Sequence, residues 1–175
     1  MKLNNIKETR ARDIMTKNVV SVFPDTSLLE ASEKLVRHEL NGLPVVNKSR
    51  KVIGIITEYD LLTKGTALHL PTFIKLFSQL SRLGDKEYLV DEGLEKTLSF
   101  TVKDVMNSNP LLLPDTASIS KVVDEFSQHH RVNPVPVVDV AGRLVGIISR
   151  FDIIRFYSDM LRKAEREYKK ANHKR

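Results

Sequence analysis

The chain has 175 residues, 41% of them hydrophobic, and a formal net charge of +6 from 28 Lys and Arg against 22 Asp and Glu. The absence of cysteine excludes disulfides, thiol catalysis and thiolate metal ligands. No segment approaches the roughly 18 to 20 consecutive apolar residues of a membrane span, and the first residues lack a secretory signal, so we expect a cytoplasmic protein that is not an integral membrane protein.

The positive charge is concentrated at the two ends of the chain. Residues 155–175 carry eight Lys and Arg against three acids, and residues 1–12 carry four against one. A basic end on a near-neutral body is more typical of a solvated helix than of a nucleic-acid-binding arm, and few aromatic residues accompany it. We therefore do not expect nucleic acid as a partner.

A short strand and a helix are predicted near the start of the chain. The β-branched run at residues 19–23 predicts a strand that ends at Pro24. Apolar residues at spacings of three and four predict a helix over residues 27–39, capped by Asp25 or Thr26. The buried stripe of this helix is expected to contain Leu28, Ala31, Leu35 and Val36.

A hairpin and a second helix follow. Hydrophobic runs at residues 43–46 and 52–56 flank a turn-prone polar stretch at 47–50, a pattern typical of two antiparallel strands. Apolar residues from Leu61 onward predict the next helix. The second half of the chain repeats this order, so each half is predicted as β, α, β, β, α, with buried helix residues Ile119, Val122 and Phe126 and with Gly142 in the hairpin turn.

Between the two halves lies a long patterned segment. Residues 66–99 are predicted to form a helical insert, because apolar residues recur at helical spacing after Pro71 and Gly84 can end the first helix. Two interpretations remain open for this insert. It is either a structural clasp against the repeats or a lid or docking surface.

The two halves are related by a tandem duplication. Four motifs occur twice in the same order, and small changes in their offset are expected at loops. The pairs are Asp13-Ile14-Met15 with Asp104-Val105-Met106, Pro24-Asp25-Thr26 with Pro114-Asp115-Thr116, Leu43-Pro44-Val45-Val46 with Val135-Pro136-Val137-Val138, and Gly54 to Asp60 with Gly146 to Asp152.

The last motif places a hydroxyl and a carboxylate three residues apart where a strand gives way to a helix. The pairs are Thr57 with Asp60 and Ser149 with Asp152. A carboxylate can accept two hydrogen bonds from a ribose diol, and N–H groups at the new helix can receive phosphate. The competing interpretation is that the hydroxyl only caps the helix. Capping and binding can also coexist.

These motifs resemble the CBS (cystathionine-β-synthase) domain family, in the tandem arrangement called a Bateman module. The resemblance implies an α+β fold of two βαββα repeats packed about a pseudo-twofold axis, with a helical insert between them and a C-terminal helix. The implied boundaries are residues 8–65 for the first repeat, 66–99 for the insert, 100–157 for the second repeat and 158–175 for a basic helix or tail.

The resemblance also implies two ligand-binding clefts, each completed by the start of the opposite repeat. One cleft is expected to contain Thr16, Val20, Asn133, Ile147, Ser149, Arg150 and Asp152. The other is expected to contain Asn41, Ile55, Thr57, Asp60, Asn107 and Leu111. Asn41 and Asn133 are equally well explained as turn residues. Because Glu58 stands where the second motif has Arg150, we expect the Arg150 cleft to bind phosphate more tightly.

By resemblance, the ligand is an adenosine compound such as AMP, ADP, ATP or S-adenosylmethionine, and the module forms a homodimer that regulates an unidentified protein. We expect no required cofactor, no metal site and no enzymatic activity, since the His129-His130 pair lacks metal-ligand spacing and no P-loop is present. The alternative function is a protein-interaction adaptor that uses the insert or the basic tail without a small ligand.

Overall fold

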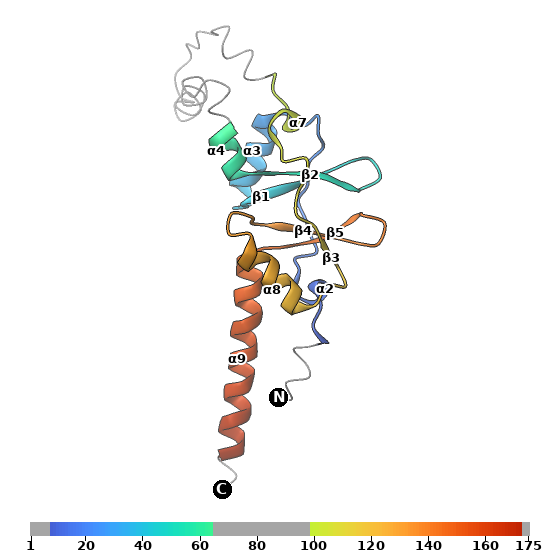
Figure 1. Ribbon diagram of the computed structural model, residues 1–175. Coiled ribbons are helices and arrows are strands. Elements are labelled where there is room, and N and C mark those ends of the chain that lie inside the picture. Colours follow the sequence, from blue (N-terminus) through green and yellow to red (C-terminus); the bar gives the residue numbers. More distant parts are fainter. Residues whose placement is uncertain (1–7, 65–98, 173–175) are drawn as a thin grey trace, which may run out of the picture. The chain divides into compact units, whose positions relative to one another are not determined.

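The computed structural model describes residues 8–64 and 99–172 (Figure 1). These residues divide into two compact units. Unit 1 contains the described residues up to Val19 and from Leu111 onward, and unit 2 contains those from Val20 to Pro110. Each unit therefore combines most of one repeat with the opening segment of the other.

Unit 2 is built on a two-stranded sheet. Strands β1 (Gly42–Val46) and β2 (Val52–Thr57) are antiparallel, with Gly42 opposite Thr57. Helix α3 (Leu28–Arg37) precedes the hairpin, and α4 (Glu58–Lys64) follows it directly. The short helix α7 (Val102–Val105) completes the unit. The core is formed where the apolar stripe of α3 meets the hairpin, with Leu28, Ala31, Leu35, Leu43, Val45 and Ile56 buried.

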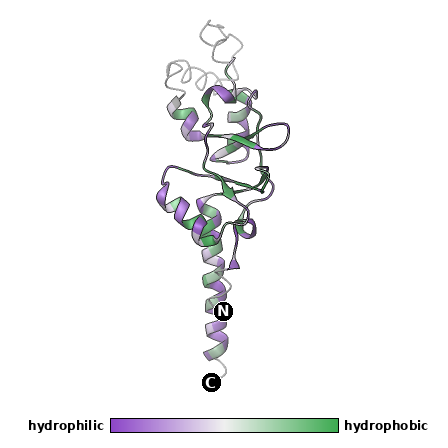
Figure 2. Ribbon diagram, turned by 45° about the vertical axis from the view of Figure 1, so that its right-hand side comes forward, coloured by the Kyte–Doolittle hydropathy of each residue, from purple (hydrophilic) through white to green (hydrophobic). Residues whose placement is uncertain are grey.

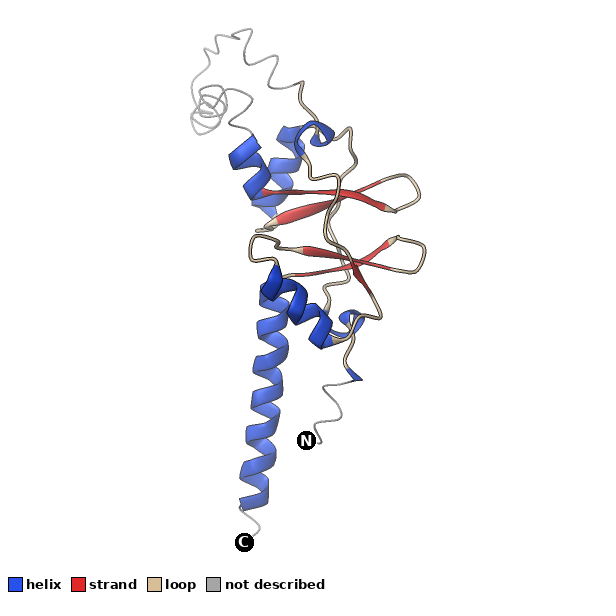
Figure 3. Cartoon of the chain, viewed as in Figure 1, coloured by secondary structure: helices blue, strands red, loops and turns tan. Residues whose placement is uncertain are grey.

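Unit 1 has the same plan with one more strand. Its sheet has the order β3 (Leu113–Pro114), β4 (Val135–Val138), β5 (Leu144–Ile148), with β3 parallel and β5 antiparallel to β4. Helix α8 (Ile119–Gln128) connects β3 to β4, and α9 (Arg150–Asn172) begins just after β5. Helix α2 (Ala11–Ile14), from the start of the chain, belongs to this unit. Figure 3 shows the helices of each unit beside its strands.

The short helices α2 and α7 dock on the opposite repeat through their backbones. Ala11 N donates to Ala117 O at 2.8 Å, and Val102 N donates to Thr26 O at the same distance. Ala11 and Val102 are completely buried. The acceptors are carbonyl groups just before α8 and α3, so the loop that starts each long helix also holds the opening segment of the other repeat.

The α+β fold class and both hairpins are confirmed, and Gly142 has the expected positive φ of 76°. The predicted cap of α3 is wrong. Ser27 is the N-cap and accepts from Glu30 N at 3.1 Å, because the Thr26 hydroxyl is engaged by Phe23 N. Val36 is also not part of the buried stripe, since it is 75% exposed.

The strand predicted at residues 19–23 is reduced to a single bridge. Val22 pairs in parallel with Val45, through hydrogen bonds to Pro44 O and from Val46 N. The predicted insert lies outside the described residues. The predicted boundary at residue 158 falls inside α9, which is one continuous helix of 23 residues. Across residues 8–64 and 99–172, no helix combines the length and hydropathy needed to cross a membrane.

Candidate ligand-binding site

The repeated motif forms a closed hydrogen-bond pair at the start of α9. Ser149 stands between β5 and α9, and both its N–H and its hydroxyl donate to Asp152 Oδ2, at 2.8 and 2.6 Å. Asp152 N donates back to Ser149 Oγ at 3.4 Å. Asp152 is only 7% exposed, and its side chain accepts a hydrogen bond from the backbone N–H of Ser149 at the start of the helix. The motif therefore caps α9, and this role can coexist with ligand binding by the second carboxylate oxygen.

The first copy of the motif has the same geometry at the start of α4. Thr57 donates to Asp60 Oδ2 from its hydroxyl at 2.6 Å and from its N–H at 3.0 Å. Asp60 N donates to Thr57 Oγ1 at 3.2 Å, and Asp60 is also 7% exposed. The structure thus brings together both hydroxyl and carboxylate pairs that the sequence predicts. Neither carboxylate points into bulk solvent.

The second oxygen of Asp152 faces the opening segment of the first repeat. Thr16 Oγ1 donates to Asp152 Oδ1 at 3.3 Å, and Arg155 Nη1 lies 3.6 Å from the same oxygen. Thr16 is held there by a backbone bridge, in which it exchanges hydrogen bonds of 2.9 and 3.0 Å with Ile147. Four residues of one predicted site, Thr16, Ile147, Ser149 and Asp152, are therefore neighbours within unit 1.

The corresponding bridge in unit 2 joins Asn107 to Ile55. The two backbones exchange hydrogen bonds of 2.9 and 3.0 Å. The Asn107 side chain differs from that of Thr16, because its Oδ1 accepts from Asn109 N at 3.0 Å in a local turn. The structure places Asn107 beside Ile55 as predicted, with its amide oxygen used within its own loop.

The motif glycines allow these bridges to form. A β-carbon at Gly54 would lie 2.7 Å from Met106 Sδ and 3.0 Å from Asn107 O, and one at Gly146 would overlap Met15. Real β-carbons do not approach other atoms this closely. The neighbour for which each glycine makes room is thus a protein segment.

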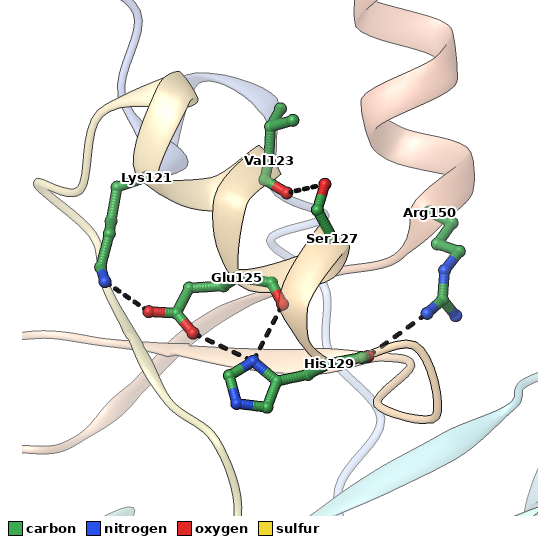
Figure 4. Close-up of polar contacts among 6 residues, drawn as sticks. All are labelled: Lys121, Val123, Glu125, Ser127, His129 and Arg150. Atoms are coloured by element: carbon green, nitrogen blue, oxygen red, sulfur yellow. Dashed lines mark hydrogen bonds and ion pairs between the residues drawn. The ribbon is translucent and has the colours of Figure 1, made fainter.

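Arg150 is oriented toward the end of α8. Its backbone N donates to Asn133 Oδ1 at 3.0 Å, which uses one of the helix-terminal N–H groups that could have received phosphate. Its guanidinium donates to His130 O at 2.5 Å and to His129 O at 3.5 Å, and lies 5.7 Å from the centre of the Phe126 ring. Figure 4 shows the side chain reaching toward His129. Arg150 therefore stabilises the carbonyl end of α8.

Glu58 occupies the equivalent position in unit 2 and makes different contacts. Glu58 N donates to Asn41 O at 3.2 Å, and Asn41 Nδ2 reaches Glu58 Oε1 at 3.5 Å. Burial raises the pKa of the Glu58 carboxyl, with a smaller contribution in the same direction from Asp60, against the hydrogen bonds that lower it. Asn41 and Asn133 thus both contact the residue that follows the motif hydroxyl.

The comparison with known families agrees with this geometry. The model of the CBS domain matches residues 11–65 and 102–159, both of which contain the motif. This chain belongs to the CBS domain family. Its two CBS domains form a tandem pair, as the sequence predicts.

Relatives of this CBS pair occur in plants and archaea. The chain is 28% identical over 156 residues to the chloroplastic CBS domain-containing protein CBSX2 of Arabidopsis thaliana, which covers 87% of this chain and 65% of CBSX2. It is 29% identical over 149 residues to the uncharacterized protein MJ1426 of Methanocaldococcus jannaschii, over 82% of this chain and 88% of that protein. The chain thus spans just under two thirds of CBSX2.

Two solved structures are similar to this CBS pair and contain adenosine compounds. The structure of CBSX2 in complex with AMP has a TM-score of 0.65 and 27% identity, and covers 86% of this chain and 97% of that one. The CBS domain pair of protein MJ0100 in complex with 5-methylthioadenosine and S-adenosyl-L-methionine has a TM-score of 0.60 and 26% identity, over 85% and 99%. Similarity to the inosine-5'-monophosphate dehydrogenase of Aquifex aeolicus covers only 24% of that enzyme.

Val20 and Leu111 do not lie in the same compact unit as the site residues that each was expected to join. Val20 packs against the core of unit 2, and Leu111 packs against that of unit 1. Their part in a ligand site stays a prediction.

Sequence reasoning missed Arg155 and Met15. The spacing of Asp152 and Arg155 on one helix face could have indicated their ion pair. The contact of Met15 with Gly146 has no local signal.

His129 is the C-cap residue of α8 and contacts Glu125. The Glu125 carboxylate lies 3.3 Å from His129 Nδ1 and 2.5 Å from Lys121 Nζ (Figure 4).

Proposed function

We propose that this CBS pair is a regulatory module that binds an adenosine compound, namely AMP, ADP, ATP or S-adenosylmethionine. The observation that carries the proposal is the buried Asp152 with one oxygen occupied by the helix cap and the other reached by a long 3.3 Å contact from Thr16. The AMP complex of the related CBSX2 supports the ligand class.

In this proposal Asp152 has two separate tasks. Its Oδ2 closes the cap of α9, and its Oδ1 accepts a hydrogen bond from a ribose hydroxyl. An ionised carboxylate oxygen has room for two such bonds, so the ribose can join Thr16 or displace it. Asp60 takes the same role in the first repeat, with Thr57 beside it. A ligand that binds one arrangement of the repeats more tightly than another shifts the population toward that arrangement.

The regulated protein is a separate partner, and the module itself acts as a homodimer without catalytic activity. Apolar side chains exposed on α4 and at the start of α9, Tyr59, Leu62 and Phe151, support such an association. The cellular location of the chain stays a prediction, since the related CBSX2 is chloroplastic.

A thermal-shift screen of the four compounds, followed by calorimetric titration, tests the proposal. A ligand at a hundred times its dissociation constant raises the free energy of unfolding by about 2.7 kcal/mol. We expect D152A to lose binding. The matched control is D104A, because Asp104 closes the cap of α7 with two hydrogen bonds of 2.8 Å from Thr101 but lies outside the segments 54–60 and 146–152 that carry the proposed ribose contacts.

If D104A lowers the affinity as much as D152A, the loss reflects destabilised caps and the proposed ribose contact is wrong. If no adenosine compound shifts the melting temperature, the adaptor function takes its place. The exposed basic helix α9 is the observation that favours that alternative. Product analysis after prolonged incubation with nucleotide tests for turnover, which we do not expect.

A further inference from the structure

Helix α9 carries a regular apolar stripe that its own unit leaves exposed. The helix packs on β5 and α2 near its start, where Asp152 and Ile153 are buried. Farther along, Ile154, Leu161 and Tyr168 are 61%, 65% and 69% exposed. Figure 2 shows alternating hydrophobic and hydrophilic colours along the helix. The stripe, called the α9 seam below, consists of Ile154, Tyr157, Leu161, Ala164, Tyr168 and Ala171.

The spacing of the α9 seam is that of a coiled coil. Its members are separated by three, four, three, four and three residues, which places them at the a and d positions of successive heptads. Single exposed apolar residues are ordinary on protein surfaces. An unbroken a/d pattern over the length of an exposed helix is unusual, and its narrow apolar face fits a single partner helix. The seam lies largely beyond residue 159, where the match to the CBS domain ends.

We propose that the α9 seam pairs with the α9 seam of a second copy of this chain, in antiparallel orientation. With the two seams fully overlapped, each small residue meets a large one. Ala164 faces Leu161 of the second copy, and Ala171 faces its Ile154. Tyr157 faces Tyr168. A parallel pair would instead place Ala164 against Ala164 and leave the layer underfilled, since well-packed layers alternate large and small side chains.

Charges beside the seam do not distinguish the two orientations, so the antiparallel orientation rests on the packing of large against small residues. In the antiparallel register the flanking positions pair Glu165 with Ser158 and Glu167 with Met160 of the second copy. Glu165 pairs with Lys169 of its own helix at 2.5 Å. In the parallel register the flanking positions pair Glu165 with Met160 and Glu167 with Asn172, without opposite charges.

The narrow apolar face of α9 and its acidic border argue against an anionic membrane as the occupant. Membrane-surface helices have a broad apolar face opposite a polar face rich in Lys and Arg. The cations of α9 do lie mainly opposite the seam, but the seam is narrow and Glu165 and Glu167 stand at its border. Because both copies of α9 carry net positive charge, added salt should strengthen the pairing of two seams by screening their repulsion. Salt would weaken binding to an acidic partner.

Sedimentation of the full chain over a range of concentrations tests the pairing. We expect the L161E substitution to halve the mass of the largest assembly, from dimer to monomer or from tetramer to dimer. The matched control is R166Q, which changes the net charge by the same single unit on the far side of the same helix. Circular dichroism of both variants confirms that α9 remains folded. Equal masses for wild type, L161E and R166Q would overturn the proposal.

Cysteine cross-linking tests the orientation, since the natural chain contains no cysteine. In the antiparallel pair, a mixture of the L161C and A164C variants forms a mixed disulfide dimer under mild oxidation, and A164C alone does not. Efficient cross-linking of A164C alone would show a parallel pair. No cross-link in either sample would mean that another helix occupies the seam. Both outcomes contradict the proposal, and neither depends on nucleotide binding.

Discussion

The side chain of Met15 fills the space that a β-carbon on Gly146 would need. Met15 belongs to the opening segment of the first repeat, and Gly146 lies in β5 of the second. The neighbouring bridge between Thr16 and Ile147 holds the two segments at hydrogen-bond distance. The glycine of the motif is therefore a packing requirement of the joint between repeats.

We expect G146A to lower the free energy of unfolding by about 1 to 3 kcal/mol, because the added methyl group overpacks the contact with Met15. A double-mutant cycle with M15A, measured by urea unfolding, should show that the two costs are less than additive. The control is G142A. No atom lies within 4 Å of its β-carbon, and its cost comes from the positive φ instead. Additive costs for G146A and M15A would contradict the overpacking.

The affinity for AMP should differ between the proposed sites of the two repeats. D152A is expected to lose more nucleotide affinity than D60A, because Glu58 adds negative charge beside Asp60 whereas the cation of Arg155 lies 3.6 Å from Asp152 Oδ1. Calorimetric titration of AMP into each variant measures the difference. S-adenosylmethionine, which carries a sulfonium cation and no phosphate, serves as the comparison and should show a smaller difference. Equal losses for AMP would remove the proposed asymmetry.

Arg150 should contribute to stability through α8. We expect R150Q to lower the free energy of unfolding by about 1 kcal/mol, because it removes the bond to His130 O and the contact with the Phe126 ring. R150K should not restore the loss, since an ammonium group cannot reproduce the planar guanidinium contacts. The control is R155Q, whose side chain is 70% exposed and which should change stability by less than about 0.5 kcal/mol. A loss as large in R155Q as in R150Q would contradict this role.

The difference in stability between the E58Q variant and the wild type should depend on pH. Burial raises the pKa of Glu58 above its ordinary value of 4.5, so the fold disfavours the ionised form. The stabilising contribution of the neutral form is complete below pH 4.5 and is lost as the pH rises through the raised pKa. At pH 7, E58Q should therefore be more stable than the wild type, and the difference should disappear below about pH 4.

E125Q is the control of opposite sign. The hydrogen bond from Lys121 lowers the pKa of Glu125, so its ionised form stabilises the fold, and this contribution is lost as the pH falls. E125Q should be less stable than the wild type at pH 7 and equal to it in acid. Thermal melts across pH 3 to 8 measure both variants. Parallel curves for E58Q and the wild type would show that burial of Glu58 has no energetic consequence.

The sequence alone predicted those parts of the molecule whose signals are local. The hairpin of β1 and β2, the buried stripe of α3 and the pairing of Ser149 with Asp152 all follow from periodicity or from short spacings along one segment. The duplication strengthened each of them, because the same pattern occurs twice. The predicted cap at Asp25 or Thr26 was wrong because several polar residues there were equally suitable, and only the geometry of the turn selects Ser27.

Contacts between distant segments were decided by the tertiary structure. Thr16 and Asp152 are 136 positions apart, and the resemblance to a family, not any local pattern, led us to expect them together. The direction of the Arg150 guanidinium depends on where α8 ends, and the space beside Gly146 depends on where Met15 lies. A sequence pattern specifies which face of an element is apolar. It does not specify which distant atoms fill the remaining space, because that choice results from packing all elements of a unit at once.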